Sequence, residues 1–364
     1  MTKSIVSTAD VLQPFIEREE LAGAVTLLAD RDGIISLEAI GWADVQNKRP
    51  MQTDSMFWIA SQTKPMTATV LMMLADEGRV ALDDTVEKYL GEFAGQMFVA
   101  KRDEDHILLK KPLHPITLRN VLSHTSGLQF SSLLEHPTLD ALPLRDAVRS
   151  YAMTPLQFEP DTDYLYSNQG TNTAARIAEV ITGTPYAQLI QERLLDPLGM
   201  NDTTFWPNAE QVNRLAKLYA PGENGAGLVE KQISQLTYPL DDARRFAMPA
   251  GGLFSTASDI SRFGRMIANG GHLDGKRLVS RAAVQEMTTR QTPVGLEGYG
   301  LGWALGESSF GHAGACSTNT SIDRKSGLIS IWLVQHDGFP GQGDRCHDEW
   351  KQAALSRSMS TRAA

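Results

Sequence analysis

The sequence has few of the residues that mark disulfide-rich and metal-binding proteins. It has two cysteines, Cys316 and Cys346, in 364 residues, which match neither a disulfide framework nor a zinc motif. Its eight histidines include no His-Glu-x-x-His motif and no close cluster with cysteine. We therefore expect two free thiols, no metal site and no cofactor.

Long apolar runs and basic clusters are also missing. An apolar run such as residues 70–75 is far shorter than the roughly 20 residues that span a bilayer. The net charge is −9 at pH 7 with no run of Lys or Arg, which argues against nucleic acid or anionic lipid as partners. Residues 1–10 show no secretory signal. We expect a cytoplasmic protein, or a periplasmic or secreted one if a leader has been removed, that acts on a small molecule.

The sequence does contain the pattern of a sheet built from both ends of the chain. The expected strands cover residues 23–29, 33–40, 299–305, 311–323 and 327–335. The expected helices cover residues 7–20, 170–182, 186–195 and 343–359. An Asp-Gly turn between the first two strands is typical of a hairpin.

These patterns predict an α+β fold, with an antiparallel sheet of about five or more strands, flanking helices and a mainly helical insertion. The composition, 42% hydrophobic and 21% charged, is that of a globular chain. We predict one catalytic domain with two subdomains and a cleft between them. The α/β subdomain covers about residues 1–80 and 245–364, and the helical subdomain about residues 81–244.

Ser61 and Lys64 are the candidate nucleophile and its base. Residues three apart share a helix face, so the hydroxyl and the amine can meet. Pro65 is tolerated mainly in a first helical turn, which predicts that the helix begins near Ser61, where unpaired N–H groups favour negative charge. A lysine can activate a serine when burial lowers the pKa of its amine. The structural alternative is that Ser61 is a plain helix cap.

Tyr166 and Asn168 form a second candidate cluster in the helical part. A tyrosine at a cleft can relay a proton, and an asparagine amide can bind a substrate carbonyl. The alternative is a buried aromatic pair beside a turn. Candidates for the cleft walls are Gln129, Phe130, Phe205 and Trp206.

A third cluster, His312, Ala313 and Gly314, is expected to enter a strand. Its small residues would let a substrate lie against the strand edge. The backbone N–H of Ala315 could then complete an oxyanion hole with that of Ser61. The alternative is a glycine-rich turn with a hydrogen-bonded histidine.

Together the three clusters resemble the serine β-lactamase and penicillin-binding-protein superfamily, whose motifs are Ser-x-x-Lys, Ser-Asp-Asn and Lys-Thr-Gly. The sequence at 166–168 is similar to the Tyr-x-Asn motif of the class C branch, which includes family VIII carboxylesterases, D-amino-acid peptidases and acyltransferases. Further stretches that resemble the family lie at residues 122–128, 197–200 and 250–256. The resemblance covers nearly the whole chain.

The resemblance implies a β-lactamase/transpeptidase-like fold and a role for each cluster. Ser61 would be the nucleophile, with Lys64 and Tyr166 as its activating pair. Asn168 would contact the substrate, and residues 312–314 would be the strand motif.

His312 departs from the lactamase pattern, in which a lysine helps to hold the substrate carboxylate. Histidine carries full charge only below its usual pKa of about 6.5, so a neutral ester is favoured over an anionic lactam. We predict a serine carboxylesterase. The alternatives are a β-lactamase, a D-amino-acid peptidase or amidase, and an acyltransferase with the same nucleophile, or a binding protein that retains only the fold. Acyl and alcohol specificity, the oligomeric state and a role for Cys316 are not readable from the sequence.

Overall fold

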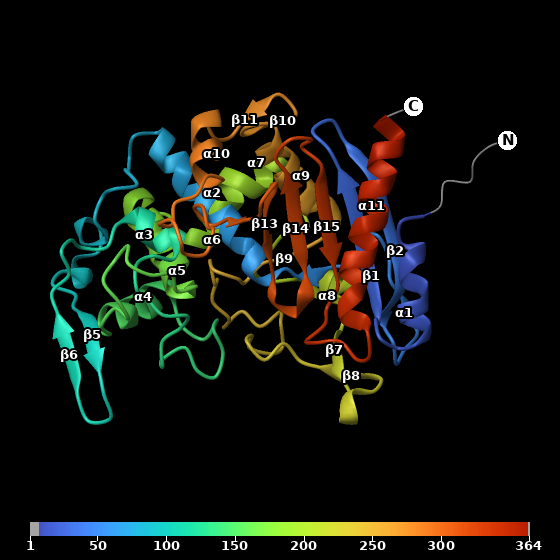
Figure 1. Cartoon of the computed structure of the whole chain (residues 1–364), viewed down its shortest axis with the longest axis horizontal. Helices are drawn as coiled ribbons and strands as arrows, with labels where there is room; N and C mark the ends of the chain where they lie inside the picture. The colour runs from blue at the N-terminus through green and yellow to red at the C-terminus, as the bar shows by residue number, and fades with distance from the viewer. Residues whose placement is uncertain (1–6, 363–364) are drawn as a thin grey trace.

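The computed structural model describes residues 7–362, with side chains for residues 7–356. Its main sheet is antiparallel and has seven strands in the order β12-β13-β14-β15-β1-β2-β3. The strands are β1 Gly23–Ala29, β2 Ile34–Asp44, β3 Arg49–Pro50, β12 Ala304–Leu305, β13 Ser309–Ala313, β14 Asn319–Asp323 and β15 Ile329–Leu333. Strands from both chain ends lie side by side (Figure 1), which confirms the predicted α+β architecture. The expectation about a leader concerns residues 1–10, of which 1–6 lie outside the described residues.

Strand β1 lies inside the sheet, between β15 and β2, and carries apolar side chains on both of its faces. All seven of its residues are buried. Successive side chains of a strand point to opposite faces. Ala24 and Leu28 pack with Trp350 of α11 in one apolar cluster, whereas Val25 and Leu27 belong to the larger core on the other face. The sheet is therefore covered on both faces.

The helices lie on the two faces of the sheet and in a separate helical region. They are α1 Gln13–Glu17, α2 Thr63–Asp76, α3 Leu118–Ser123, α4 Leu144–Ala152, α5 Asn168–Thr182, α6 Tyr186–Ile190, α7 Asp196–Leu198, α8 Ala209–Arg214, α9 Ala257–Ala268, α10 Arg281–Met287 and α11 Cys346–Arg362. α1 and α11 pack on one face of the sheet and α9 on the other, with α3 to α5 on the far side of α2 (Figure 1). Within residues 7–362, no helix is long and apolar enough to cross a membrane.

The remaining strands form four two-stranded pairs outside the main sheet. They are β4 Phe57–Trp58 with β9 Phe254–Ser255, β5 Phe98–Arg102 with β6 Ile107–Lys110, β7 Leu218–Pro221 with β8 Leu228–Lys231, and β10 His272–Leu273 with β11 Lys276–Arg277. The β4–β9 pair joins the segment before α2 to the segment before α9. The subdomain boundaries near residues 80 and 245 stay a prediction.

Some expected elements differ from the structure at their boundaries or in number. The helix expected at residues 7–20 is only a 3₁₀ turn, Asp10–Leu12, followed by α1. The strand expected at residues 311–323 is two strands, because Cys316 and Ser317 adopt left-handed φ angles of 61° and 69° that reverse the chain. These two residues carry a Cβ, so nothing in their side chains marks the turn.

The strand expected at residues 299–305 is mostly a turn, and only β12 at its end is a strand. Gly302 has a left-handed φ of +73°, and a Cβ there would lie 2.9 Å from the Lys64 carbonyl oxygen. The turn therefore brings this segment directly against α2, which carries the candidate base.

Candidate active site

Ser61 lies in a 3₁₀ turn, Ala60–Gln62, that leads directly into α2. The helix therefore begins where the sequence predicts, with Pro65 in its first turn. Ala60 has a left-handed φ of 46°, a conformation that a residue with a Cβ rarely adopts. This bend turns the chain from β4 into the helix, and Ser61 lines a cleft with mainly apolar walls.

Lys64 is fully buried on α2, behind Ser61. Its Nζ lies 3.1 Å from Ser61 Oγ, 2.6 Å from Asn168 Oδ1 and 2.8 Å from the Ala250 carbonyl oxygen. Burial holds the pKa of Lys64 well below its usual value, because a charged amine loses its hydration there. A neutral amine has two N–H groups and one lone pair. Asn168 Oδ1 and the Ala250 carbonyl oxygen each accept a hydrogen bond from one of these N–H groups. The lone pair can then accept the proton of the Ser61 hydroxyl.

Tyr166 lies beside this pair, with its ring centroid 4.5 Å from Lys64 Nζ. Burial raises the pKa of the Tyr166 phenol above its usual value, and the nearby Ser61 hydroxyl opposes only part of that rise. The phenol is therefore protonated at neutral pH and can donate a proton. The rings of His124 and Phe130 lie 4.7 Å and 6.4 Å from that of Tyr166 and restrict its orientation.

Asn168 is the first residue of α5, and the capping of that helix positions it. Ser167 caps α5 by accepting a hydrogen bond from the Gly170 N–H at 2.9 Å, as serine commonly does. Its backbone N–H donates to His124 Nδ1 at 3.2 Å. Because Asn168 Oδ1 accepts from Lys64, the amide Nδ2 is left to donate to a substrate.

His312 lies on β13, which borders the cleft. β12 pairs with β13 only at Gly311 and Phe310, so the strand edge beyond Gly311 is free of β12. His312 Nδ1 donates to the Ala313 carbonyl at 2.5 Å, and Nε2 accepts from the Tyr299 hydroxyl at 2.8 Å. Burial, together with the nearby Lys64 side chain, lowers the pKa of His312 to about 3. The imidazole is therefore neutral over a wider range of pH than the sequence predicts.

The two N–H groups expected to form the oxyanion hole both lie at the cleft. Within the described residues, neither the Ser61 N–H nor the Ala315 N–H donates a hydrogen bond. The turns that contain them pack against each other. Gly314 permits this approach, because a Cβ there would lie 2.4 Å from the Ile59 carbonyl oxygen. The arrangement is suited to an oxyanion between the two donors.

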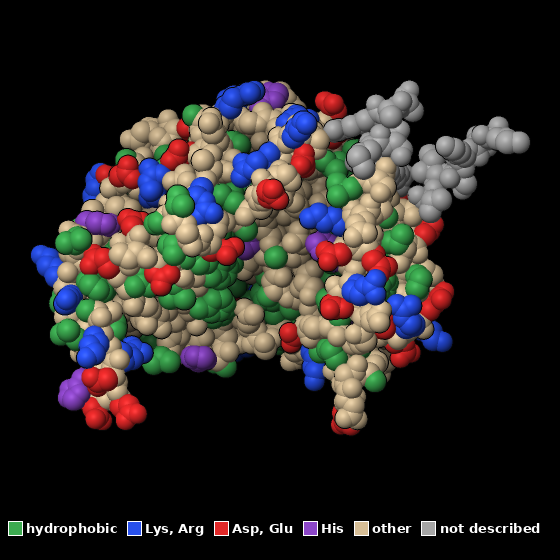
Figure 2. Space-filling view, in the orientation of Figure 1, with side chains coloured by type: hydrophobic (Ala, Val, Ile, Leu, Met, Phe, Trp, Pro, Cys, Tyr) green, Lys and Arg blue, Asp and Glu red, His purple; other side chains and the backbone are tan. Residues whose placement is uncertain are grey.

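The cleft has a volume of about 400 Å³. It is lined by Trp58, Ala60, Ser61, Phe130, Tyr164, Tyr166, Asn168, Gln235, Met248, Gly251, Glu297, Tyr299, Ala304, His312, Ala313, Gly314 and Ala315. The molecular surface is hollowed here, with hydrophobic side chains around the hollow (Figure 2). Of the four expected wall residues, Phe130 lines the cleft, whereas Gln129, Phe205 and Trp206 do not.

A buried hydrogen-bond chain behind Lys64 was not predicted from the sequence. Tyr151 donates to Glu135 Oε1 at 2.6 Å, and Asn172 Nδ2 donates to the Tyr151 oxygen at 3.0 Å. The Ala250 N–H donates to Asn172 Oδ1 at 3.0 Å. The hydrogen bonds therefore run from a buried carboxyl group to the backbone N–H of Ala250, the residue whose carbonyl oxygen accepts from Lys64.

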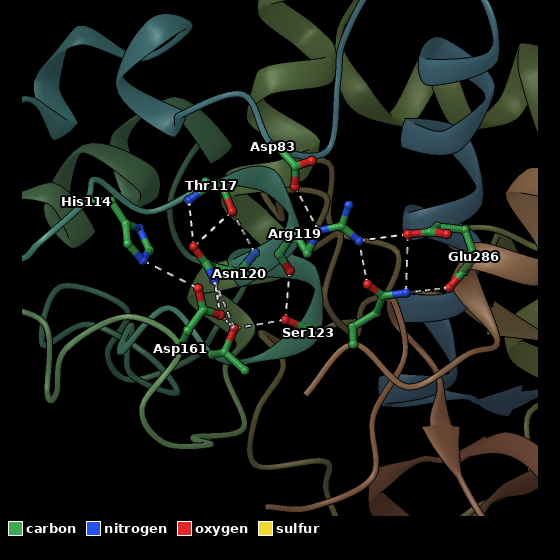
Figure 3. Close-up of polar contacts among 10 residues, drawn as sticks. Asp83, His114, Thr117, Arg119, Asn120, Ser123, Asp161 and Glu286 are labelled. Carbon is green, nitrogen blue, oxygen red and sulfur yellow. Dashed lines mark hydrogen bonds and ion pairs between the residues drawn. The ribbon is translucent and has the colours of Figure 1, made fainter. Parts of the chain in front are cut away.

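A second polar network, shown in Figure 3, surrounds α3 and reaches the other side of the cleft. Arg119 Nε donates to Asp83 at 2.8 Å, and Nη1 donates to Glu286 at 2.7 Å and to the Gln291 side chain. The Gln291 N–H donates to the Tyr299 carbonyl at 2.8 Å. Arg119 therefore ties the helical region to the segment that carries the Tyr299 hydroxyl.

Two further observations on residues 7–356 concern metal ligands and thiols. No group of three or more His, Cys, Asp and Glu side chains gathers in a way that could hold a metal ion. Cys316, beside Ala315, is a free thiol. Burial raises the pKa of Cys316 to about 12, so it is not a thiolate at neutral pH.

Comparisons with known proteins show the family and the fold of the chain. The family model described as Beta-lactamase matches residues 8–355. An uncharacterised protein of Mycobacterium tuberculosis is 31% identical over 354 residues, covering 87% of this chain and 86% of its own length. Esterase EstB of Burkholderia gladioli is 30% identical over 324 residues, covering 81% and 77%. The solved structure of EstCE1, described as a hydrolase with promiscuous acyltransferase activity, has a TM-score of 0.79 at 22% identity, covering 95% and 97%.

Proposed function

The chain belongs to the beta-lactamase family of serine hydrolases, and on that premise we propose that it cleaves carboxylic esters through an acyl-enzyme on Ser61. The neutral Lys64 amine takes the Ser61 proton as Oγ attacks the ester carbonyl. The N–H groups of Ser61 and Ala315 hold the resulting oxyanion. Tyr166, a protonated phenol at neutral pH, passes a proton to the leaving alkoxide and regains one from Lys64.

Water then releases the acid by the reverse sequence of proton transfers. Tyr166 takes a proton from the attacking water as it passes its own proton to Lys64, and Lys64 then gives a proton to Ser61 Oγ when the bond between Oγ and the acyl carbon breaks. The Asn168 amide Nδ2 orients the substrate carbonyl throughout.

The neutral state of His312 is the observation that carries the choice of ester over lactam. His312 stands where the lactamase pattern has a lysine, and its two ring nitrogens are occupied by Ala313 and Tyr299. With a pKa of about 3, it offers no charge to a substrate carboxylate. The name of EstB, the esterase relative at 30% identity, supports the same choice.

The deciding experiment compares purified wild type with Ser61→Ala on three substrates. These are p-nitrophenyl butyrate, a chromogenic cephalosporin and a D-alanine anilide. We expect ester turnover by wild type and a loss of about 10³-fold or more in the variant. Ser308→Ala, which changes an exposed serine outside the cleft, is the matched control and retains wild-type turnover.

Mass spectrometry of the wild type quenched during turnover checks the intermediate. We expect a butyryl adduct on the peptide that contains Ser61. Preferential turnover of the cephalosporin or the anilide would replace the ester proposal by the corresponding activity. Absence of turnover on all three would indicate a binding protein.

A further inference from the structure

The cleft has a one-sided distribution of charge. Among its lining side chains, Glu297 alone carries a formal charge at neutral pH. His312 is neutral there, with a pKa of about 3. Lys64 lies behind Ser61, is completely buried and does not line the cleft. A substrate group in the cleft therefore meets one negative charge and no positive one.

The walls of the cleft are rich in aromatic rings. Trp58, Phe130, Tyr164, Tyr166 and Tyr299 all line it. The rings of Tyr164 and Tyr299 lie 5.9 Å apart with their planes tilted by 48°. The face of an aromatic ring is electrically negative and attracts cations, including alkylammonium groups. Aromatic faces and a carboxylate together favour a cation over a neutral group of the same shape.

Glu297 is held at the cleft by its own loop. The Thr292 hydroxyl donates to the Glu297 carbonyl at 2.6 Å, and Arg290 Nη1 donates to the neighbouring Leu296 carbonyl at 3.2 Å. Burial raises the pKa of Tyr164 above its usual value, and the negative charge of Glu297 adds to that rise, so the carboxylate lies near the aromatic wall.

The Glu297 carboxylate is available to a ligand. Within the described residues, no basic side chain forms an ion pair with it, although the molecule has ion pairs elsewhere. Arg290, the basic residue of the same loop, uses Nη1 on Thr292 Oγ1 and on the carbonyls of Pro293 and Leu296, and it does not line the cleft. The carboxylate is exposed, so a cation can reach it from solvent.

We propose that the partly exposed ring of Tyr164 and the carboxylate of Glu297 form a subsite for a cationic group of the substrate. The substrates are then esters that carry an alkylammonium group within reach of the scissile carbonyl, rather than esters that carry a carboxylate. This inference rests on the proposed esterase function for its substrate class, but its binding component does not depend on turnover.

The kinetic test uses two esters that differ only in one atom of the alcohol part. Butyrylcholine carries a quaternary nitrogen where 3,3-dimethylbutyl butyrate carries a carbon, so the ratio of their kcat/KM values isolates the charge. We expect wild type to prefer the cationic ester by about fivefold. The preference should fall at high salt, because the carboxylate is exposed.

Two variants assign the preference to the subsite. Glu297→Gln and Tyr164→Leu should each bring the ratio toward one. Glu307→Gln makes the same charge change on an exposed residue that does not line the cleft, and it should retain the wild-type ratio. A ratio near one in wild type, or an equal loss in Glu297→Gln and Glu307→Gln, would overturn the proposal.

A binding measurement separates this inference from the proposed function. Titration calorimetry with choline should show weaker binding to Glu297→Gln than to wild type and to Glu307→Gln. If no ester is hydrolysed but this difference is present, the esterase proposal fails and the cation subsite stands. If p-nitrophenyl butyrate is hydrolysed and choline binds all three proteins equally or not at all, the subsite is wrong and the esterase proposal stands.

Discussion

The floor and the mouth of the cleft are built in different ways. We call Ser61 and Asn168, together with Lys64 directly behind Ser61, the cleft floor. We call Phe130 and Glu297 the cleft mouth. Lys64 and Asn168 are 0% and 5% exposed, and hydrogen bonds from three separate segments meet at the Lys64 amine. Phe130 is 43% exposed, and Glu297 lies on a loop held by hydrogen bonds to its backbone.

This difference separates chemistry from specificity. A buried polar group must be hydrogen-bonded, so each floor residue constrains the others and tolerates little change. A side chain at the mouth has solvent as an alternative partner and can change with smaller effects on folding. We therefore expect substitutions in the floor to change the rate of the reaction and substitutions at the mouth to change the choice of substrate.

The largest effect is expected for Lys64→Met, which keeps an unbranched side chain of similar size but removes the base. We expect kcat/KM on p-nitrophenyl butyrate to fall by about 10³-fold. Thermal unfolding should show only a small loss of stability, because removal of the buried amine offsets part of the cost of leaving the Asn168 and Ala250 oxygens without their donor. Lys88→Met, which removes a half-exposed lysine paired with Asp84, is the control. Retention of more than a tenth of the activity in Lys64→Met would place the base elsewhere.

The pH dependence of kcat/KM should show which floor residue titrates. As pH falls, Lys64 takes a proton and loses the lone pair that activates Ser61, so activity falls on the acid side. Because the pKa of Lys64 is well below its usual value, activity persists to a pH far below 10. His312, with a pKa of about 3, stays neutral over that range. His312→Gln should therefore leave the acid limb at the same pH, and a shifted limb would assign the titration to His312.

A fully buried ion pair lies beside the segment of Gln235, which lines the cleft, and its removal tests whether the surroundings of the mouth tolerate substitution as a whole. Asp140 and Arg245 are each 1% exposed and lie 2.7 Å apart. Asp140→Asn leaves a buried guanidinium without its counter-ion and should lower the free energy of unfolding by about 3 kcal/mol. Asp274→Asn makes the same change in an exposed pair with Arg262 and should lower it by under about 0.5 kcal/mol.

Urea unfolding curves of the two variants measure this difference. Equal effects would mean that the surroundings of the mouth gain no stability from the buried pair. In that case the floor and the mouth would differ in burial but not in how well they tolerate substitutions.

Tyr151→Phe tests how far the constraint on the floor extends behind Lys64. The variant removes the donor to Glu135 and the acceptor for Asn172, so the Asn172 side chain that accepts from the Ala250 N–H is held less firmly. We expect kcat to fall by about fivefold with KM nearly unchanged, and the free energy of unfolding to fall by about 2 kcal/mol. Tyr89→Phe removes a comparable bond, from a phenol to Asp84 at 2.6 Å, away from the cleft. It should lower stability without lowering kcat.

The floor could be predicted from the sequence because its central contact is local. Ser61 and Lys64 lie three residues apart, and Pro65 places the start of the helix. The buried hydrogen bonds behind them could not be predicted. Glu135, Tyr151 and Asn172 lie far from Lys64 in the sequence, and only tertiary packing brings them together. The turn at Cys316 was missed because left-handed φ angles at residues with a Cβ have no sequence signal. The position of Glu297 at the mouth could not be predicted, because it depends on the conformation of a loop, which has no periodic sequence pattern.

The smallest effect is expected for His312→Lys, at the boundary between floor and mouth. The lysine places a cation at the cleft, where the Tyr299 hydroxyl can accept from it in place of donating to the imidazole. We expect the ratio of kcat/KM for p-nitrophenyl hemisuccinate over p-nitrophenyl butyrate to rise by only about threefold, because burial at this position disfavours the charged form of the amine. His272→Lys, on the separate β10–β11 hairpin, makes the same change in charge away from the cleft and should leave the ratio unchanged. A rise in the ratio without loss of butyrate turnover would place His312 functionally at the mouth, whereas loss of both activities would place it in the floor.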